Sequence, residues 1–218
     1  MLFRRRWLAF LAIYALLSVA AGFTAPLVGR VPLSCFDQTL RMQSWFYCVL
    51  NRHYVVPDLA DVLADASAAM ARQHPGTETL ILDAGFPFLD GFPLLPHLSH
   101  DDGRKADLAF YYKKGGDVLP GRTRSPIGYF AFEDGPTSCS AEWGSLRWSF
   151  HWLQPLWPDW SVDRMRMRSI MQILIQDQRV GKILLEPHLV KAWNVAGPKV
   201  RFQGCGAARH DDHIHIQL

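Results

Sequence analysis

Apolar residues recur at helical spacing in two stretches of the chain. Residues 58–73 and 161–178 place apolar side chains three or four positions apart, which predicts two amphipathic helices. Asp58 and Ser161 stand at their starts and are the expected N-caps. The side chains expected to face the core are Leu59, Val62, Leu63, Ala66 and Met70 in the first helix, and Val162, Met165, Ile170, Ile173 and Leu174 in the second.

Compact apolar runs between and after these helices have the length and composition of β-strands. They predict strands at residues 79–84, 107–112, 180–186, 199–202 and 213–218. Helices and strands in this order indicate an α+β domain with a small, mostly antiparallel sheet and flanking helices.

The N-terminal region has a different pattern, with positive charge followed by a long apolar segment. Arg4, Arg5 and Arg6 precede a run from Trp7 to Gly29 that carries no charge and is long enough to cross a hydrocarbon layer of about 30 Å. Positive charge before the run predicts that its N-terminal end is cytoplasmic and that the rest is exported. Residues 1–30 therefore form a membrane anchor, or a signal segment cleaved near SVAAG, and residues 31–218 form the exported domain.

Charge and cysteine content narrow the environment further. A net charge of +3 without a long basic stripe gives no indication of nucleic-acid binding. All four cysteines follow the anchor, an even number that suits an oxidising compartment. We expect Cys35 to pair with Cys48, which is nearby in sequence, and Cys139 with Cys205, although some could instead remain free buried thiols.

The final strand suggests the chemistry of the domain. Side chains alternate along a strand, so His213 and His215 share one face while the isoleucines between and after them face the core. His100 and Asp107 lie in a second polar stretch of the chain, with Asp107 at the mouth of the predicted strand 107–112. The loop at Gly103 can turn the chain so that Asp107 faces back toward His100. His100, Asp107 and His215 would make a three-ligand zinc site with a fourth position open, the pattern of catalytic zinc.

Two motifs resemble those of the penicillin-insensitive murein endopeptidases. These are zinc enzymes of the superfamily that also contains D-Ala-D-Ala peptidases, lysostaphin-type peptidases and the hedgehog signalling domain. The resemblance covers residues 75–218. It is carried by SHDDGRKAD, which contains Ser99, His100, Gly103 and Asp107, and by HDDHIH, which contains His210, Asp211, His213 and His215. It implies a hedgehog/D-Ala-D-Ala-peptidase-like fold, that His100, Asp107 and His215 bind Zn²⁺, and that His97 is a further histidine near the metal.

The same resemblance implies catalytic roles for the closing motif. His213 would act as the general base, with Asp212 as the alternative because D-Ala-D-Ala peptidases place a glutamate three residues before the last zinc histidine. His210, beside the cleft, would either support a zinc ligand or orient the substrate. Asp83, at the end of a predicted strand, would either hydrogen-bond a zinc ligand or shape the turn that follows.

These features together predict a zinc metallopeptidase of the murein endopeptidase type. Its partner would be the peptide stems of peptidoglycan, in the periplasm, with the domain anchored to the inner membrane or secreted if the N-terminal segment is cleaved. A D,D-carboxypeptidase or dipeptidase is the alternative among enzymes. A non-catalytic, zinc-containing module that binds the cell wall is the alternative of another class.

Overall fold

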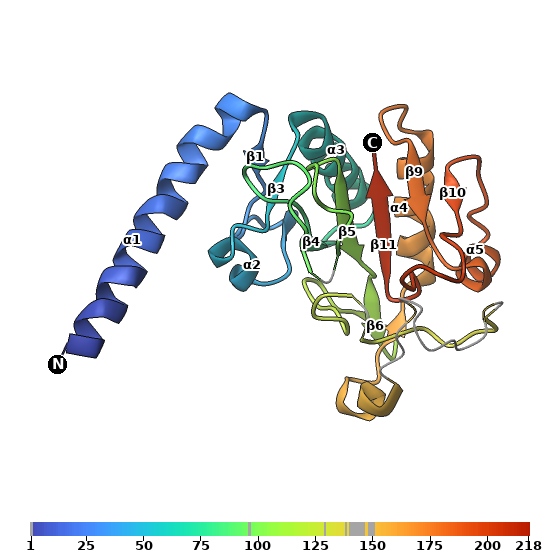
Figure 1. Cartoon of the computed structure of the whole chain (residues 1–218). Helices are drawn as coiled ribbons and strands as arrows, with labels where there is room; N and C mark the ends of the chain where they lie inside the picture. Colours follow the sequence, from blue (N-terminus) through green and yellow to red (C-terminus); the bar gives the residue numbers. More distant parts are fainter. Residues whose placement is uncertain (1, 96, 129, 138, 140–146, 148–150) are drawn as a thin grey trace.

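The computed structural model describes residues 2–95, 97–128, 130–137, 139, 147 and 151–218. The first element, α1 (Leu2–Thr24), continues into the short helix η1 (Ala25–Val28) and projects away from the rest of the chain (Figure 1). The segment Phe3–Val28 is long and apolar enough to cross a membrane, and very little of it is buried by the other residues. The expected apolar helix is therefore present, with the properties of a signal or an anchor.

The main sheet has six strands and is mixed. In spatial order the strands are β10 (Val200–Arg201), β9 (Lys182–Leu184), β11 (His213–Gln217), β5 (Lys105–Ala109), β4 (Thr79–Asp83) and β2 (Leu40–Met42). The three inner pairings are antiparallel, as expected, whereas both edge pairings, β10 with β9 and β2 with β4, are parallel. The α+β class is confirmed, and the sheet is larger and more mixed than the predicted one.

Short elements complete the fold around this sheet. There are two small antiparallel sheets. One pairs β1 (Val31–Pro32) with β3 (Tyr54–Val55). In the other, β6 (Tyr112–Lys114) lies between β7 (Asp117–Val118) and β8 (Ser161–Val162). The short helices are α2 (Trp45–Val49), η2 (His151–Leu156) and α5 (Pro187–Trp193).

The helix α3 (Pro57–Gln73) packs on the core face of the sheet, and its five predicted core residues are all buried. Its N-cap is Val56 rather than Asp58. The helix begins one residue earlier than expected because Pro57 occupies the first turn, where its fixed φ suits a helix and its missing N–H costs nothing. Asp58 then lies within the first turn, where its charge is favourable at the positive end of the helix.

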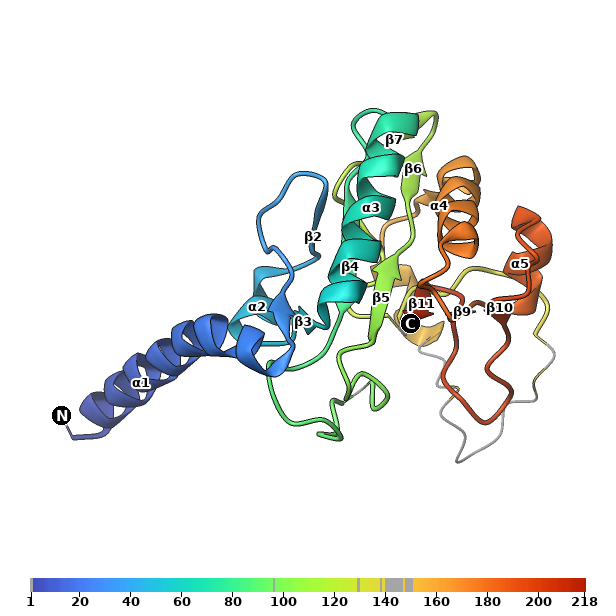
Figure 2. The same cartoon turned by 90° about the horizontal axis from the view of Figure 1, so that it is seen from above.

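The helix α4 (Arg164–Gln176) packs beside α3, as the view in Figure 2 shows, and differs more from its prediction. Asp163, not Ser161, caps it, because the Asp163 carboxylate accepts hydrogen bonds from two backbone N–H groups of the first turn. Ser161 belongs instead to β8, which pairs with β6. The buried face of α4 consists of Arg166, Met167, Ile170, Met171 and Leu174, so the prediction for Met165 is wrong, since this residue is 60% exposed, and Ile173 is only partly buried.

The strand predicted at residues 107–112 is two strands. β5 ends at Ala109 and β6 begins at Tyr112, because the chain leaves the main sheet between them. The N–H of Tyr111 contacts the Met167 sulfur at 3.3 Å, and the C=O of Tyr111 accepts from the N–H of Asp163 at 2.8 Å. β5 also begins at Lys105, two residues before the predicted start, so Asp107 lies in the middle of the strand rather than at its mouth.

Both predicted disulfides are present, Cys35–Cys48 and Cys139–Cys205, and the described residues include no free cysteine. The first links the segment before β2 to α2, and the second links two segments that are distant in sequence. Disulfides of this kind are typical of proteins that fold outside the cytoplasm.

We expect the chain isolated from membranes without reductant to offer no alkylatable thiol. Mass spectrometry after alkylation should detect four modified cysteines only in the reduced sample. Four modified cysteines in the unreduced sample would contradict both pairings and remove the argument for an oxidising compartment.

The Asp163 cap can be tested by two substitutions. Asp163→Ala removes the oxygen that accepts from both N–H groups, and it removes the ion pair to buried Arg166, whose Nη1 lies 2.7 Å from the other oxygen, so the free energy of unfolding should fall by at least about 1 kcal/mol. Asp163→Asn keeps a cap acceptor and should unfold at an intermediate denaturant concentration. Identical unfolding midpoints for the parent and the alanine variant would show that the cap is dispensable.

Candidate metal centre

Acidic and imidazole side chains gather on the face of the main sheet opposite the hydrophobic core. The core side of β5 and β11 is formed by Ala106, Leu108, Ile214 and Ile216. On the other side His215 lies directly opposite Asp107, and Asp107 directly opposite Asp83. Residues opposite one another in antiparallel strands point to the same face, so three neighbouring strands present these groups together. An irregularity in β4 between Ile81 and Asp83 brings Asp83 into this register.

The three predicted ligands converge on one another. Nδ1 of His215 lies 2.8 Å from Oδ1 of Asp107, and Nε2 of His100 lies 3.3 Å from each of these two atoms. All three side chains are buried, and their potential ligand atoms lie within 4.8 Å of one another. The predicted convergence is confirmed, and the donor set of two imidazoles and one carboxylate is the one that catalytic zinc commonly takes.

A second group of donors adjoins the first and shares His100. Nδ1 of His97 lies 2.5 Å from Oδ2 of Asp83 and 3.0 Å from Oδ2 of Asp107. Nδ1 of His100 lies 3.8 Å from Oδ2 of Asp83, too far for a hydrogen bond, and this buried atom has no hydrogen-bond partner among the described residues. Asp83, His97 and His100 could therefore hold an ion as well.

Asp83 is held from outside the cluster by Arg52. The Arg52 Nε donates to Oδ1 of Asp83 at 3.0 Å, and its terminal nitrogens donate to Oδ2 of Asp83 and to the C=O of Leu95. Of the two roles considered for Asp83, hydrogen bonding within the site is the one it has here. Arg52 was not foreseen, because nothing in the spacing of a lone arginine 31 residues from its partner indicates the contact.

His213 lies next to the ligand set and is oriented by Asp212. Its Nε2 is 3.8 Å from Oδ1 of Asp107, and its Nδ1 is 2.6 Å from Oδ1 of Asp212. The other Asp212 oxygen accepts from the Ser125 hydroxyl at 2.8 Å and from the Phe130 N–H at 3.0 Å. Both oxygens of Asp212 are thus engaged, and the carboxylate fixes the orientation of the His213 ring.

His210 lies beside the two histidines of β11 and is buried with them. Its ring centroid is 5.0 Å from that of His213 and 5.6 Å from that of His215. The C=O of His210 accepts from the N–H of Glu186 at 3.0 Å, and the Glu186 carboxylate pairs with Arg147 through two contacts of 3.0 Å. The predicted site residues therefore all lie in one cluster.

The surroundings favour the protonation states that metal ligands need. Burial opposes ionisation of Asp107, but the charges of His100, His97 and His213 outweigh it and hold the pKa of this carboxyl well below its usual range. Burial also lowers the pKa of His215 to about 4, despite its contact with Asp107. An ionised carboxylate and a neutral imidazole are the forms that coordinate a metal.

The neighbouring histidines differ from one another in protonation. Burial opposes the charged form of His97, but Asp107 and Asp83 outweigh it and raise its pKa to about 9. Asp107 and Asp212 likewise raise the pKa of His213 against the effect of burial. Burial, followed by the charges of His213 and His215, lowers the pKa of His210 well below its usual value.

Two cavities reach this cluster from different sides. One, of about 170 Å³, is bordered by His97, His100, His210 and His215. The other, of about 360 Å³, is largely apolar and reaches His97, Asp83 and Arg52 from the side of α2. The cluster is therefore accessible although its side chains are individually buried.

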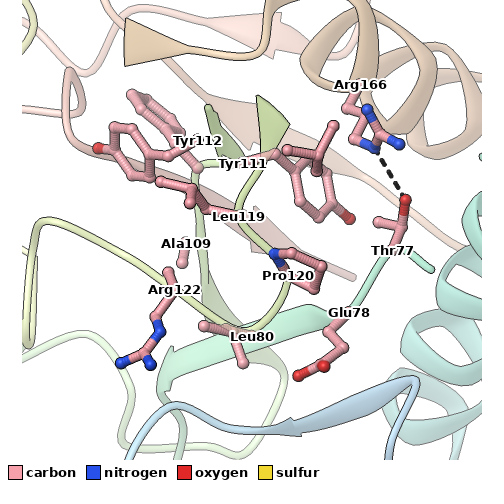
Figure 3. A pocket seen from close by; sticks show the side chains of 12 residues that line it. Thr77, Glu78, Leu80, Ala109, Tyr111, Tyr112, Leu119, Pro120, Arg122 and Arg166 are labelled. Carbon is pink, nitrogen blue, oxygen red and sulfur yellow. Dashed lines mark hydrogen bonds between the residues drawn. The ribbon is translucent and has the colours of Figure 1, made fainter. Parts of the chain in front are cut away.

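A third hollow lies apart from the cluster. The Arg166 Nε donates to the Thr77 hydroxyl at 2.9 Å at its edge. Figure 3 shows these two residues with Glu78, Arg122 and Tyr111 among the lining side chains. Its volume of about 10 Å³ leaves room for about one water molecule.

Cys35, Cys48 and His53 also lie within ligand distance of one another, but the two cysteines are disulfide-bonded and are not available to a metal.

Comparison with known proteins does not identify the chain. No protein-family model matches it, and no curated protein matches it. The functional argument therefore rests on the geometry of the cluster.

The ligand set predicts the result of one substitution. Asp107→Asn keeps the size of the side chain but removes its negative charge, so bound metal should fall from about one ion per chain to nearly none in elemental analysis after incubation with zinc. Asp163→Asn also replaces a buried aspartate, away from the cluster, and should retain the metal. Metal retained by Asp107→Asn, or absent from the parent chain, would contradict this assignment.

Proposed function

We propose that the chain is a zinc-dependent peptidase that cleaves amide bonds in the peptide stems of peptidoglycan, as murein D,D-endopeptidases do. The observation that carries the proposal is the arrangement of four residues across β5, β11 and the loop before β5. His100, Asp107 and His215 offer ligand atoms within 4.8 Å of one another, and His213 stands 3.8 Å from Asp107 on the same face. This is a ligand set accompanied by an oriented imidazole.

His100, Asp107 and His215 would hold the zinc ion. When bound, zinc in such a site lowers the pKa of its water to about 7 and polarises a carbonyl group. Three protein ligands leave a coordination position for that water, and the cavity beside His100, His210 and His215 gives a substrate access to it.

His213 is the proposed general base. With Nδ1 committed to Asp212, the ring directs Nε2 toward the ligand set, where it can accept the proton of the attacking water and pass it to the leaving amine. Asp212 is less suited to this role because its two oxygens already accept hydrogen bonds from His213, Ser125 and Phe130. His210, with its depressed pKa, is a neutral group that would orient the substrate.

The proposed location is the outer side of the cytoplasmic membrane, in the periplasm. Three arginines precede the apolar helix α1, which favours a cytoplasmic N-terminus and an exported domain. The two disulfides suit an oxidising compartment. In this arrangement α1 anchors the enzyme to the inner membrane, and cleavage of the helix would release the domain instead.

One observation favours a second candidate, a non-catalytic, zinc-containing module that binds the cell wall. His97 places Nδ1 3.0 Å from Oδ2 of Asp107, so a fourth protein donor is close to the three proposed ligands. A zinc site closed by four protein ligands is structural rather than catalytic. The same His97 nitrogen, Nδ1, lies 2.5 Å from Oδ2 of Asp83. Because Asp83 engages this atom, the contact argues against His97 as a fourth zinc ligand and for the open, catalytic arrangement.

The base assignment predicts that His213→Ala abolishes hydrolysis but retains zinc. The loss in rate on purified crosslinked muropeptide dimers should be on the order of a hundredfold or more, because a positioned proton acceptor is removed while the ligands remain. Asp212→Asn should have a smaller effect, since the amide oxygen can still accept from His213. Product analysis of each reaction, with elemental analysis of the same samples, measures both quantities.

The substrate distinguishes the alternatives. Cleavage of dimers indicates an endopeptidase, whereas release of D-Ala from monomeric stems alone indicates a carboxypeptidase. Inactivity of the zinc-loaded parent on both substrates, with retained binding to peptidoglycan, would support the non-catalytic module. If His213→Ala remained active while an Asp212 variant was inactive, the base would be Asp212.

A further inference from the structure

The row of residues next to the metal ligands on the main sheet carries positive charge. The strands β9, β11 and β5 lie side by side (Figure 1). In β11, Gln217 follows His215 by two residues, so the two side chains share one face and are about 7 Å apart along the strand. Directly opposite Gln217 are Lys182 of β9 and Lys105 of β5. We call Lys182, Gln217 and Lys105 the lysine row.

The lysine row lines the same cavity as the metal cluster. The cavity of about 170 Å³ that His100, His210 and His215 border is also lined by all three members of the row. Among the described residues that line it there is no aspartate or glutamate. The cavity beside the proposed ligands therefore suits an anionic group better than a cationic one.

The two lysines differ in whether their charge is already balanced. Nζ of Lys105 lies 2.6 Å from Oδ2 of Asp102 and 3.8 Å from Oδ1 of Asp101. Lys182 is partly buried, and within the described part of the chain its ammonium group has no carboxylate within 4.0 Å and no hydrogen-bond acceptor. Taking a charged group partly out of water is unfavourable unless a partner compensates for the loss. Lys182 is thus the member of the row that gains most from a bound anion.

The order of residues along β11 places the lysine row on the side of the metal ligands away from the proposed base. His213, His215 and Gln217 follow one another on one face of the strand. A scissile amide at His215 has its leaving nitrogen toward His213, because that residue returns the proton. The acyl part of the substrate then extends toward Gln217 and Lys182.

We propose that the lysine row is a subsite for a carboxylate in the acyl part of the substrate, with Lys182 as the residue that binds it and Gln217 as a second donor. The inference rests on the proposed peptidase function and specifies which substrates that site selects. The peptide stems of peptidoglycan carry free carboxylates, and amidation neutralises them without changing the peptide backbone. An amide has no charge to pair with Lys182, so amidation of the acyl stem removes the charge-assisted part of this contact.

The test compares the zinc-loaded full chain on three crosslinked muropeptide dimers. One has free carboxylates, one is amidated in the acyl stem, and one is amidated in the leaving stem. Amidation of the acyl stem should raise KM about tenfold, because a hydrogen bond between two charged groups is lost. The value of kcat should change little, since the contact exists in the ground state and the transition state alike. Amidation of the leaving stem should leave KM unchanged.

Substitutions identify the residue responsible. Lys182→Met keeps most of the side-chain volume, so it should raise KM for the free dimer about tenfold and have no further effect on the acyl-amidated dimer. Lys182→Arg should restore most of the lost affinity. Lys105→Met should have a smaller effect, because Asp102 already balances that charge. Lys114→Met removes an exposed lysine of β6 and is the matched control, with no change expected. Retained zinc and intact disulfides verify folding.

Three results would overturn the proposal. The first is an equal KM for the free and the acyl-amidated dimer. The second is the same loss in Lys114→Met as in Lys182→Met, which would reflect net charge and not a contact. The third is sensitivity to amidation of the leaving stem alone, because the recognised carboxylate would then lie on the other side of the amide.

Binding to the zinc-loaded His213→Ala chain separates failure of the subsite from failure of the proposed hydrolysis. Calorimetry on this variant should show about tenfold weaker binding of the acyl-amidated dimer than of the free dimer, and adding Lys182→Met should abolish the difference. That result would support the subsite even if the parent chain hydrolysed neither dimer. Hydrolysis of both dimers with equal KM would instead leave the proposed function intact and refute the subsite.

Discussion

The buried charge of Asp107 is the constraint on which the polar face of the sheet depends. Its carboxylate lies in the middle of the main sheet and is 1% exposed, where an uncompensated negative charge would cost several kcal/mol. Four histidine nitrogens lie within 3.8 Å of its oxygens, those of His97, His100, His213 and His215. Protonated imidazoles or a bound cation can both balance this charge, and a cation does so while using the imidazoles as ligands.

Two of the histidines around Asp107 are positioned by carboxylates that are themselves held by residues from other parts of the chain. Asp83, held by Arg52, fixes His97, and Asp212, held by Ser125, fixes His213. Such outer contacts set ring orientation and determine which nitrogen faces the ion. The precision of the cluster thus comes from several loops that are anchored on the rigid sheet, and not from β5 and β11 alone.

The parts of this arrangement that could be predicted from sequence are those with a local pattern. The alternation in HIHIQL places two imidazoles on one face, and helical spacing identifies the buried side of α3. The rest depends on long-range contacts. Asp163 replaces Ser161 as the cap because Ser161 is required by β8. The edge strand β2 is too short to show a pattern, and nothing local to the predicted strand at residues 199–202 indicates that β10 pairs parallel to β9. Arg52 reaches Asp83 only because the chain folds back on itself.

The strand order has a consequence for when the protein can acquire its chemistry. β11 follows every other strand of the main sheet in the chain, yet it lies between β9 and β5 and joins the two sides of the sheet. A chain that emerges from its N-terminal end onward presents β2, β4, β5, β9 and β10 before the strand that connects them. Since β11 also carries His213 and His215, closure of the sheet is also the step that brings His215 beside His100 and Asp107, so that folding completes both together and late.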